Sequence, residues 1–314
     1  MRLKYMTMCV AVACATMIAA GCSSPDDPTG GTDMPENGGG TSGEEPGGGS
    51  DNGGGSDNGG GSETPGNSGT DTSTWTLVFE DDFESDDSST PDPDKWVLAE
   101  KGTDSWNRYL SESYDQAYIS DGSLHLIAEQ VDGQYLTGAI ETRGKFEFEH
   151  GKVECRARFL RQPQGNHTGI WMMPAPPTEQ WPKSGEIDIM EHLSADDIVY
   201  QTVHTWYADD MGHNTDPKPQ GTAKVDNSDW NTYGIVWTAD SITFTINGEN
   251  YLSYPNLNLS GEDGAYQWPF NHPFYLILSQ SLGGEGTWAG PIDNSQLPAD
   301  FEIDWIKVWQ PSEE

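Results

Sequence analysis

Residues 184–192 read SGEIDIMEH, a stretch that combines the pattern of a buried strand with an unusual amount of charge. Its apolar residues, without a helix cap or a 3.6-residue period, predict a β-strand. Three carboxylates interrupt the apolar pattern within six residues: Glu186, Asp188 and Glu191. The strand is therefore a candidate site as well as a structural element.

The spacing of the carboxylates predicts a β-bulge. Side chains alternate along a strand, so Glu186 and Asp188 share one face, whereas Glu191 would point to the other. One extra residue around Ile189–Met190 restores the phase. We therefore expect all three carboxylates on one face.

The next segment, IVYQTVHTWY (198–207), is predicted to return antiparallel to this strand after a turn at 194–197. With the bulge opposite Gln201, the expected pairs are Glu191 with Tyr200, Asp188 with Thr202, and Glu186 with His204. On this register the same face also carries Tyr200, Thr202, His204 and Trp206.

Two carboxylates about 5–5.5 Å apart are the apparatus of a retaining glycosidase. In that chemistry Glu186 is expected to be the nucleophile and Glu191 the general acid and base, while Asp188 shares a proton with Glu186. A solvated acidic face and a calcium site are the alternatives. The segment lacks the glycine and backbone carbonyls of a calcium loop, so both are disfavoured.

From Trp75 onward the chain reads as strand after strand, separated by Gly, Pro, Asn and Asp. SLHLIAEQ, KVECRARF and SITFTI alternate in polarity, and ING followed by ENYL signals a hairpin. We predict an all-β fold, a two-sheet antiparallel β-sandwich of jelly-roll type with a concave substrate cleft. The 12 Trp and 12 Tyr exceed the needs of such a core and suit stacking on sugar rings.

The N-terminal residues predict export and lipidation. Residues 1–21 have a basic start, an apolar run too short for a comfortable transmembrane anchor, and a small-residue cleavage site before Cys22. Residues 22–74 comprise this lipidation cysteine and a tether rich in Gly, Ser and Asp, with GGGSDN repeats. The domain is expected at 75–311, on a cell-surface or outer-membrane lipoprotein whose acyl chains reach the membrane.

The net charge and the number of cysteines exclude some classes of partner and a disulfide-bonded fold. The formal net charge of −36 argues against nucleic acid and against polyanionic polysaccharides. Of four cysteines, two remain after processing, Cys22 and Cys155, which excludes a disulfide framework. We expect a monomer that acts on a neutral polysaccharide and requires no cofactor.

The sequence resembles the family-16 glycoside hydrolases, whose bulged branch carries E-x-D-x-x-E; GEIDIME matches it in full. The likeness extends over most of 77–310, through LVFEDDF, TGAIETRGKFEFEHGKVECRARF, GIWMMP, FYLILSQSLGG and FEIDWIKVWQ. It implies endo-acting, retaining hydrolysis on a β-jelly roll, with Glu186 as nucleophile, Asp188 as assisting acid and Glu191 as acid/base.

The resemblance also implies binding residues. Trp171 and Trp181 correspond to sugar platforms, and His204 to a neighbour of the catalytic face. Asn107 and Arg108 lie where relatives contact the sugar beside the cleavage point, and Trp288 either caps the cleft or packs. Members of the family often hold a structural calcium away from the cleft, with an Asp like Asp304.

The substrate is less constrained than the mechanism, because the runs HLSADDIVYQTVHTWY and NHTGIWMMPAPP depart from laminarinase patterns. The first hypothesis is an endo-β-1,3(4)-glucanase acting on laminarin or mixed-linkage glucan. The second is an endo-β-1,4-galactosidase, an O-glycanase acting on poly-N-acetyllactosamine of host mucin. A non-catalytic surface glycan-binding lipoprotein and a sulfated-galactan hydrolase are the further alternatives.

Overall fold

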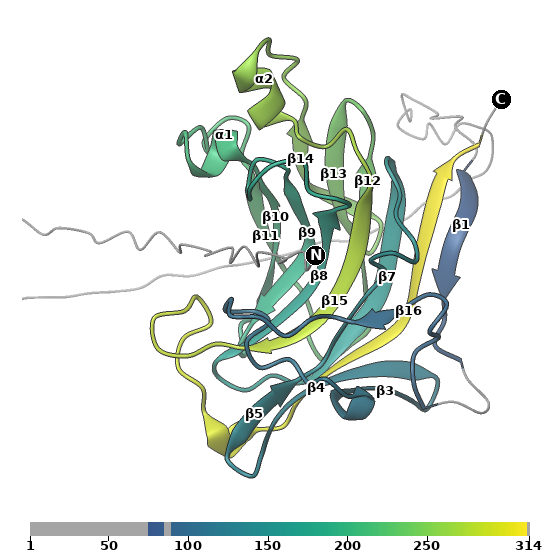
Figure 1. Ribbon diagram of the computed structural model, residues 1–314, viewed down its shortest axis with the longest axis vertical. Coiled ribbons are helices and arrows are strands. Elements are labelled where there is room, and N and C mark those ends of the chain that lie inside the picture. The colour runs from purple at the N-terminus through teal and green to yellow at the C-terminus, as the bar shows by residue number, and fades with distance from the viewer. Residues whose placement is uncertain (1–74, 85–88, 313–314) are drawn as a thin grey trace, which may run out of the picture. The chain divides into compact units, whose positions relative to one another are not determined.

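The computed structural model describes residues 75–84 and 89–312, and these form two β-sheets with a few short helices (Figure 1). Sheet A has the order β14 (Glu249–Pro255), β13 (Ser241–Ile246), β12 (Asn231–Trp237), β7 (Gly151–Arg161), β16 (Ala299–Pro311), β4 (Ser123–Val131), β3 (Ala117–Ser120), with β1 (Trp75–Asp81) paired to β16 and β5 (Gln134–Thr137) to β4. Sheet B has the order β11 (Gln220–Lys224), β10 (Ile198–His204), β9 (Glu186–Leu193), β8 (Asn166–Pro174), β15 (Phe274–Leu282), β6 (Ala139–Glu141), β2 (Val97–Leu98).

The named strands pair antiparallel throughout, which confirms the predicted two-sheet sandwich. β1 and β16, at the two ends of the described chain, pair directly, with Trp75 opposite Pro311. The hairpin between β13 and β14 turns at Asn247 and Gly248, whose φ angles of 52° and 82° suit a tight primed turn.

The core lies between the two sheets. Strand β7 shows how the sequence builds it, because its alternate residues Val153, Cys155, Ala157 and Phe159 are buried in one cluster. The inner face of sheet B contributes residues of β8, β9 and β15 to the same cluster. Cys155 is buried and free, and burial raises the pKa of its thiol.

The helices among the described residues are short, and the sequence pattern did not predict them. They are α1 (Trp206–Asp209), α2 (Glu262–Gln267), and the 3-10 helices η1 (Tyr114–Gln116) and η2 (Asn294–Gln296). α1 and α2 lie together beyond one end of sheet B (Figure 1). None of the helices in the described ranges has the length and apolar character needed to cross a bilayer.

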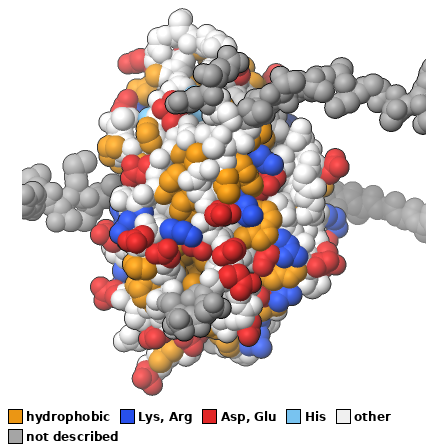
Figure 2. Space-filling model, turned by 90° about the vertical axis from the view of Figure 1, so that its right-hand side faces the viewer, with side chains coloured by type: hydrophobic (Ala, Val, Ile, Leu, Met, Phe, Trp, Pro, Cys, Tyr) orange, Lys and Arg blue, Asp and Glu red, His pale blue; other side chains and the backbone are white. Residues whose placement is uncertain are grey.

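Ion pairs cover the outer face of sheet A. Figure 2 looks onto the side where β1, β16 and β7 lie, and its basic and acidic side chains are interspersed. Three of these pairs join β16 to a neighbouring strand: Arg156–Asp304, Arg158–Glu302 and Lys307–Glu80.

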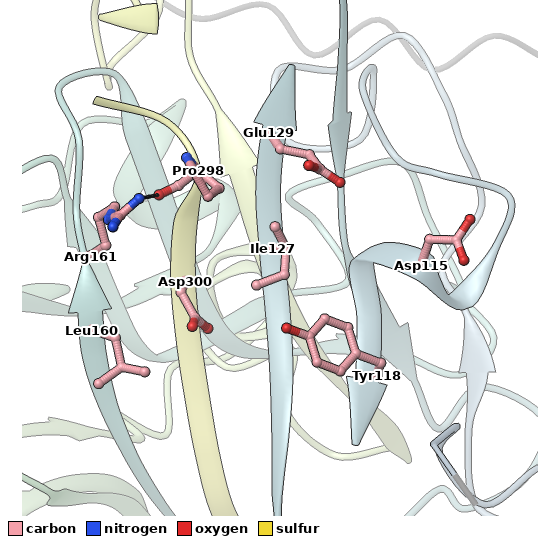
Figure 3. A pocket seen from close by; sticks show the side chains of 8 residues that line it. All are labelled: Asp115, Tyr118, Ile127, Glu129, Leu160, Arg161, Pro298 and Asp300. Atoms are coloured by element: carbon pink, nitrogen blue, oxygen red, sulfur yellow. Dashed lines mark hydrogen bonds between the residues drawn. The ribbon is translucent and has the colours of Figure 1, made fainter. Parts of the chain in front are cut away.

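A hollow of about 500 Å³ also opens on sheet A, lined from β3, β4, β7 and β16 (Figure 3). Its lining residues include Tyr118, Glu129, Arg161 and Asp300. None of the predicted catalytic or sugar-binding residues lines it.

Candidate active site

The bulge in β9 has the predicted form and position. In the pairing with β10, Glu191 lies opposite Tyr200, Asp188 opposite Thr202 and Glu186 opposite His204, and the register shifts between Tyr200 and Thr202. The buried Gln201 side chain donates from Nε2 to the Ile189 carbonyl at 3.2 Å, so the bulge carbonyl keeps a hydrogen-bond partner. The predicted register is confirmed.

The pairing with β8 places Asp188 and Glu191 on one face of sheet B, and Glu186, two residues before Asp188, has the same parity. Glu191 lies opposite Gly169 and Asp188 opposite Trp171, so both share the face of these alternate β8 residues. This is the face opposite the core, since Ile170 and Met172 point inward.

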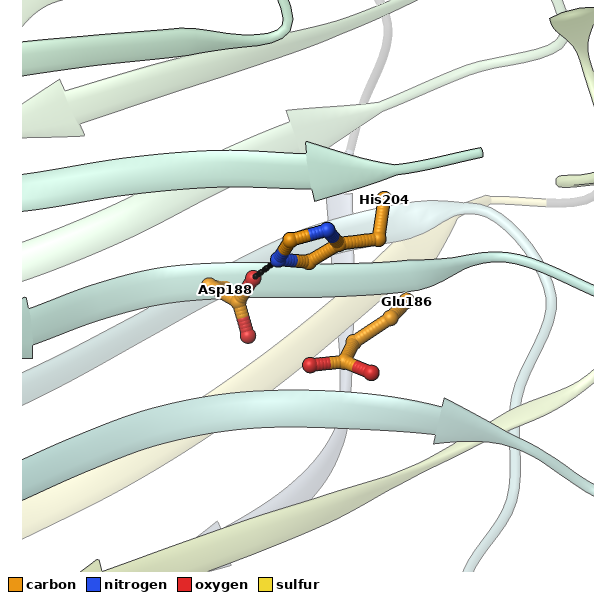
Figure 4. A group of neighbouring side chains, drawn as sticks. All are labelled: Glu186, Asp188 and His204. Carbon is orange, nitrogen blue, oxygen red and sulfur yellow. Dashed lines mark ion pairs between the residues drawn. The ribbon is translucent and has the colours of Figure 1, made fainter. Parts of the chain in front are cut away.

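Glu186 and Asp188 are held by different partners. The Trp181 indole donates from Nε1 to Glu186 Oε2 at 2.6 Å. Asp188 is only 2% exposed, and its Oδ2 lies 3.4 Å from His204 Nε2 (Figure 4).

Burial makes ionisation of these two carboxyl groups less favourable. It raises the pKa of Glu186, although His204 and the Trp181 hydrogen bond counteract it. Burial and the charges of Glu191 and Glu186 raise the pKa of Asp188 well above its ordinary range. Two close carboxylates with raised pKa values can share one proton, which is the role predicted for Asp188 beside Glu186.

His204 is the cationic neighbour of this pair. Burial alone would lower its pKa, but Asp209, which lies 3.2 Å from its Nδ1, and the charges of Glu186 and Asp188 raise it well above the ordinary value. Asp209 belongs to α1, so the helix orients the imidazole.

Glu191 has its own set of neighbours. His167 Nε2 lies 3.0 Å from Glu191 Oε1. Trp288, 49% exposed, packs edge-on against His167 at 5.5 Å and against Tyr200 at 5.0 Å. Trp288 therefore lies beside the acid/base candidate.

A second aromatic pair is formed by Trp106 and Trp171, and Trp171 lies opposite Asp188 in the pairing of β8 with β9. Trp171 donates from Nε1 to Ser279 Oγ at 3.1 Å, and its ring meets the edge of Trp106 at 4.8 Å. The Trp106 carbonyl accepts from Ser281 Oγ at 2.9 Å, which ties this loop to β15.

Asn107 and Arg108 build that loop. Asn107 is buried, and its Oδ1 accepts from the Asp104 amide at 3.0 Å. Arg108 donates to the Gly283 carbonyl and stacks over Tyr109 at 4.8 Å. These contacts shape the loop that carries Trp106.

The predicted position of Trp206 on the strand face is wrong. β10 ends at His204, and Thr205 caps α1 by accepting from the Ala208 amide, which turns the chain away. Lys183 Nζ lies 4.8 Å from the centre of the Trp206 ring. Trp206 thus lies with the loop that carries Trp181.

Of the two remaining candidates, one lies on the other sheet and one is outside the described residues. Asp304 is on sheet A and pairs with the Arg156 guanidinium, so its carboxylate already has a cationic partner. Among the described residues, the group of His, Cys, Asp and Glu side chains placed closely enough to hold a metal ion lies elsewhere. A calcium ion at Asp304 stays a prediction. Cys22 lies outside the described residues.

Four site residues were missed by sequence reasoning: His167, Asp209, Trp106 and Tyr275. Burial and the charge of Glu141 raise the pKa of Tyr275 to about 12, and the charge of Glu186 contributes to the same shift. His167 is an even number of residues from Trp171 on β8, and Tyr275 from Ser279 on β15, so both side chains point to the face of the site. This alternation was the signal in the sequence that could have identified them.

Asp188→Asn is expected to raise the melting temperature at neutral pH by about 2–4 °C, which corresponds to roughly 1 kcal/mol. The pKa of Asp188 is higher in the folded chain than in the unfolded chain, so the free energy of unfolding falls as pH rises from the unfolded pKa to the folded pKa. Asn does not titrate, so the variant keeps this part of the stability. Calorimetry at pH 7 and near pH 4 tests this, because the gain should vanish at the acid value; an equal gain at both would contradict it.

His167→Phe is expected to lower kcat on the polysaccharide about 10- to 100-fold, because Glu191 loses a charge-assisted hydrogen bond that positions it. His167→Gln should recover part of the loss. The burst rate on an aryl glycoside with a good leaving group should hardly change, since that group departs without an acid. An equal loss in the burst rate and in kcat on the polysaccharide would show a merely structural role.

The fold and the site together define a class. A jelly-roll sandwich whose bulged strand presents three carboxylates on the face opposite the core, flanked by Trp side chains, is a glycoside hydrolase. The model of glycosyl hydrolases family 16 matches residues 105–307, and the chain belongs to that family.

Two sequence relatives differ in what their names say they cleave. A keratan-sulfate endo-1,4-beta-galactosidase of Sphingobacterium multivorum is 37% identical over 249 residues, 76% of this chain and 56% of that protein. A beta-glucanase of Rhodothermus marinus is 33% identical over 253 residues, 75% of this chain and 85% of that protein. The chain therefore spans little more than half the length of the galactosidase.

Solved structures show the same division. The laminarinase from Rhodothermus marinus aligns with a TM-score of 0.68 and 30% identity, covering 77% of this chain and all of that one. A structure described as "Prominent members of the human gut microbiota express endo-acting O-glycanases to initiate mucin breakdown" aligns with a TM-score of 0.68 and 29% identity, covering 76% of this chain and all of that one.

Proposed function

We propose that this chain hydrolyses internal β-glycosidic bonds of a neutral polysaccharide with retention of configuration. The observation that carries the proposal is the bulge, which brings Glu191 to the face that holds the buried pair Glu186 and Asp188. A solvated acidic face would have no need of a buried, proton-sharing pair. A pure binding protein would gain nothing from it either.

In the proposed mechanism, Glu186 attacks the anomeric carbon while Glu191 gives its proton to the departing oxygen. Trp181 fixes the orientation of Glu186, and Asp188 takes up or releases the shared proton as the charge of Glu186 changes. Glu191 then removes a proton from water, whose oxygen displaces Glu186 and completes the hydrolysis.

The cations around the site favour a neutral substrate. Arg143 pairs with the buried Glu141 at 2.6 Å, and Lys183 lies 3.7 Å from Glu179. The Arg108 guanidinium donates to the Gly283 carbonyl and stacks over Tyr109. A sulfated chain would need cations without such partners.

Within neutral chains, a β-1,3(4)-glucan is the first candidate substrate, supported by the likeness to the glucanase and laminarinase of Rhodothermus marinus. An unsulfated β-1,4-galactoside of the poly-N-acetyllactosamine type is the second, favoured by the 37% identity to the endo-galactosidase. Both use the same carboxylates, so the choice depends on the sugar-binding loops.

Incubating the full chain separately with laminarin, barley mixed-linkage glucan and mucin O-glycans tests both candidates. Short glucan oligosaccharides would support the first and released lactosamine fragments the second. NMR of the earliest product should show the β-anomer, whereas an initial α-anomer would contradict a retaining mechanism.

We also propose that the chain is a surface lipoprotein anchored through Cys22, supported by the basic start, the apolar run and the Ala-Ala-Gly before it. Cys22→Ser should move the protein from the membrane fraction of a lipidating bacterial host to the soluble fraction. Cys14→Ser, within the segment expected to be removed, is the matched control and should leave partition unchanged. Membrane partition that survives Cys22→Ser would refute the anchor.

A further inference from the structure

Three side chains of the active site have the donor set of a transition-metal site. Glu186, Asp188 and His204 each offer one ligand atom, and these atoms lie within 4.8 Å of one another (Figure 4). His204 Nε2 and Asp188 Oδ2 are 3.4 Å apart. Two ligands of a tetrahedral zinc ion with bonds of about 2.1 Å have about the same separation, roughly 3.4 Å.

Asp188 gives an independent indication of a ligand. Its side chain is buried, and Oδ2 accepts no hydrogen bond from any part of the chain that the structure describes. The 3.4 Å contact of Oδ2 with His204 Nε2 is an ion pair without a hydrogen bond, which leaves the buried oxygen only partly satisfied. A zinc ion that replaces the imidazolium proton would bond to both atoms.

The surroundings hold the three ligands in place. Asp209 Oδ2 lies 3.2 Å from His204 Nδ1, the arrangement of carboxylate, histidine and metal that leaves Nε2 to coordinate. The Trp181 hydrogen bond to Oε2 restrains Glu186 and leaves its second oxygen available.

We propose that Glu186, Asp188 and His204 form a zinc-binding site, and that bound zinc reversibly blocks hydrolysis by occupying the nucleophile. The blocking step rests on the proposed role of Glu186. One nitrogen and two oxygen ligands with an open fourth position suit zinc, whereas magnesium and calcium prefer six or more oxygens.

The first experiment measures binding directly. Calorimetric titration of zinc chloride into the full chain should show one site that His204→Gln weakens at least 10- to 100-fold and Asp209→Asn about 10-fold. His125→Gln is the matched control, since His125 also faces a carboxylate, Asp300, at 3.1 Å, but on sheet A. Equal affinity in the wild type and His204→Gln would overturn the site.

The second experiment measures inhibition. Zinc should raise KM without changing kcat, since the ion and the donor sugar compete for Glu186, and a chelator should restore the rate. Magnesium at the same concentration should have no effect. A fall in kcat at unchanged KM would overturn the blocking step.

The two proposals fail separately. If Glu186→Gln keeps its activity, the nucleophile assignment fails, while calorimetry still reports on the metal site. If Glu186→Gln is inactive and the wild type shows no site dependent on His204, only the zinc proposal fails.

Discussion

Glu186→Gln is expected to lower kcat on the polysaccharide by about 10⁴- to 10⁶-fold, with the fold intact. The amide oxygen of Gln is too poor a nucleophile to form the glycosyl-enzyme, although Gln keeps the size of Glu and an oxygen for the Trp181 indole. Near-normal turnover would refute the nucleophile assignment. Initial rates, together with a melting curve, measure the effect.

A matched control separates this loss from a general effect of removing charge. Glu154→Gln removes a carboxylate from sheet A, where it pairs with Lys152 at 2.7 Å. A partly exposed pair of this kind contributes at most about 1 kcal/mol, so kcat should be unchanged.

Azide tests the position of the nucleophile. In Glu186→Gly, azide can enter the vacated space and bond to the anomeric carbon as the leaving oxygen departs with the proton of Glu191. Attack from that face inverts the configuration, so the product should be an α-glycosyl azide. A β-glycosyl azide would place the nucleophile elsewhere.

The carboxylate face could be predicted from sequence because two local rules meet there. The alternation of side chains along a strand determines which residues share a face. The apolar residues of 184–192 fit a single register, and only if the strand contains a bulge. Glu191 opposite Tyr200 follows from these rules and a four-residue turn. The hairpin at Asn247 and Gly248 could be predicted in the same way, from alternating polarity in the strand and from turn-forming residues after it.

The contacts that tune the site could not be predicted in this way. His167 meets Glu191 from a neighbouring strand, 24 positions away, and no motif links them. Asp209 reaches His204 only because α1 starts at Trp206, and a helix of four residues has no periodic signal. The misplacement of Trp206 has the same origin, since the strand pattern was continued past its end.

Glu191→Ala is expected to lower kcat on the polysaccharide by about 10²- to 10⁴-fold, because a sugar alkoxide is a poor leaving group unless an acid protonates it. A dinitrophenyl β-glycoside of the preferred disaccharide leaves without a proton, so Glu186 should still be glycosylated in a rapid burst. Release of the sugar should then be slow, since no base activates the water. A rate on the dinitrophenyl substrate that falls as far as that on the polysaccharide, with no burst, would contradict the assignment.

Azide separates the roles of Glu191 and Glu186 by stereochemistry. In Glu191→Ala, azide needs no base and displaces Glu186 from the anomeric carbon of the glycosyl-enzyme. Two successive inversions give net retention, so the product should be a β-glycosyl azide and turnover of the dinitrophenyl substrate should rise with azide concentration. The α-azide expected from Glu186→Gly and the β-azide expected from Glu191→Ala arise together only if the first carboxylate bonds to the sugar and the second transfers protons. An α-azide from Glu191→Ala would mean that Glu186 forms no covalent intermediate, and the bulge would then serve an inverting mechanism.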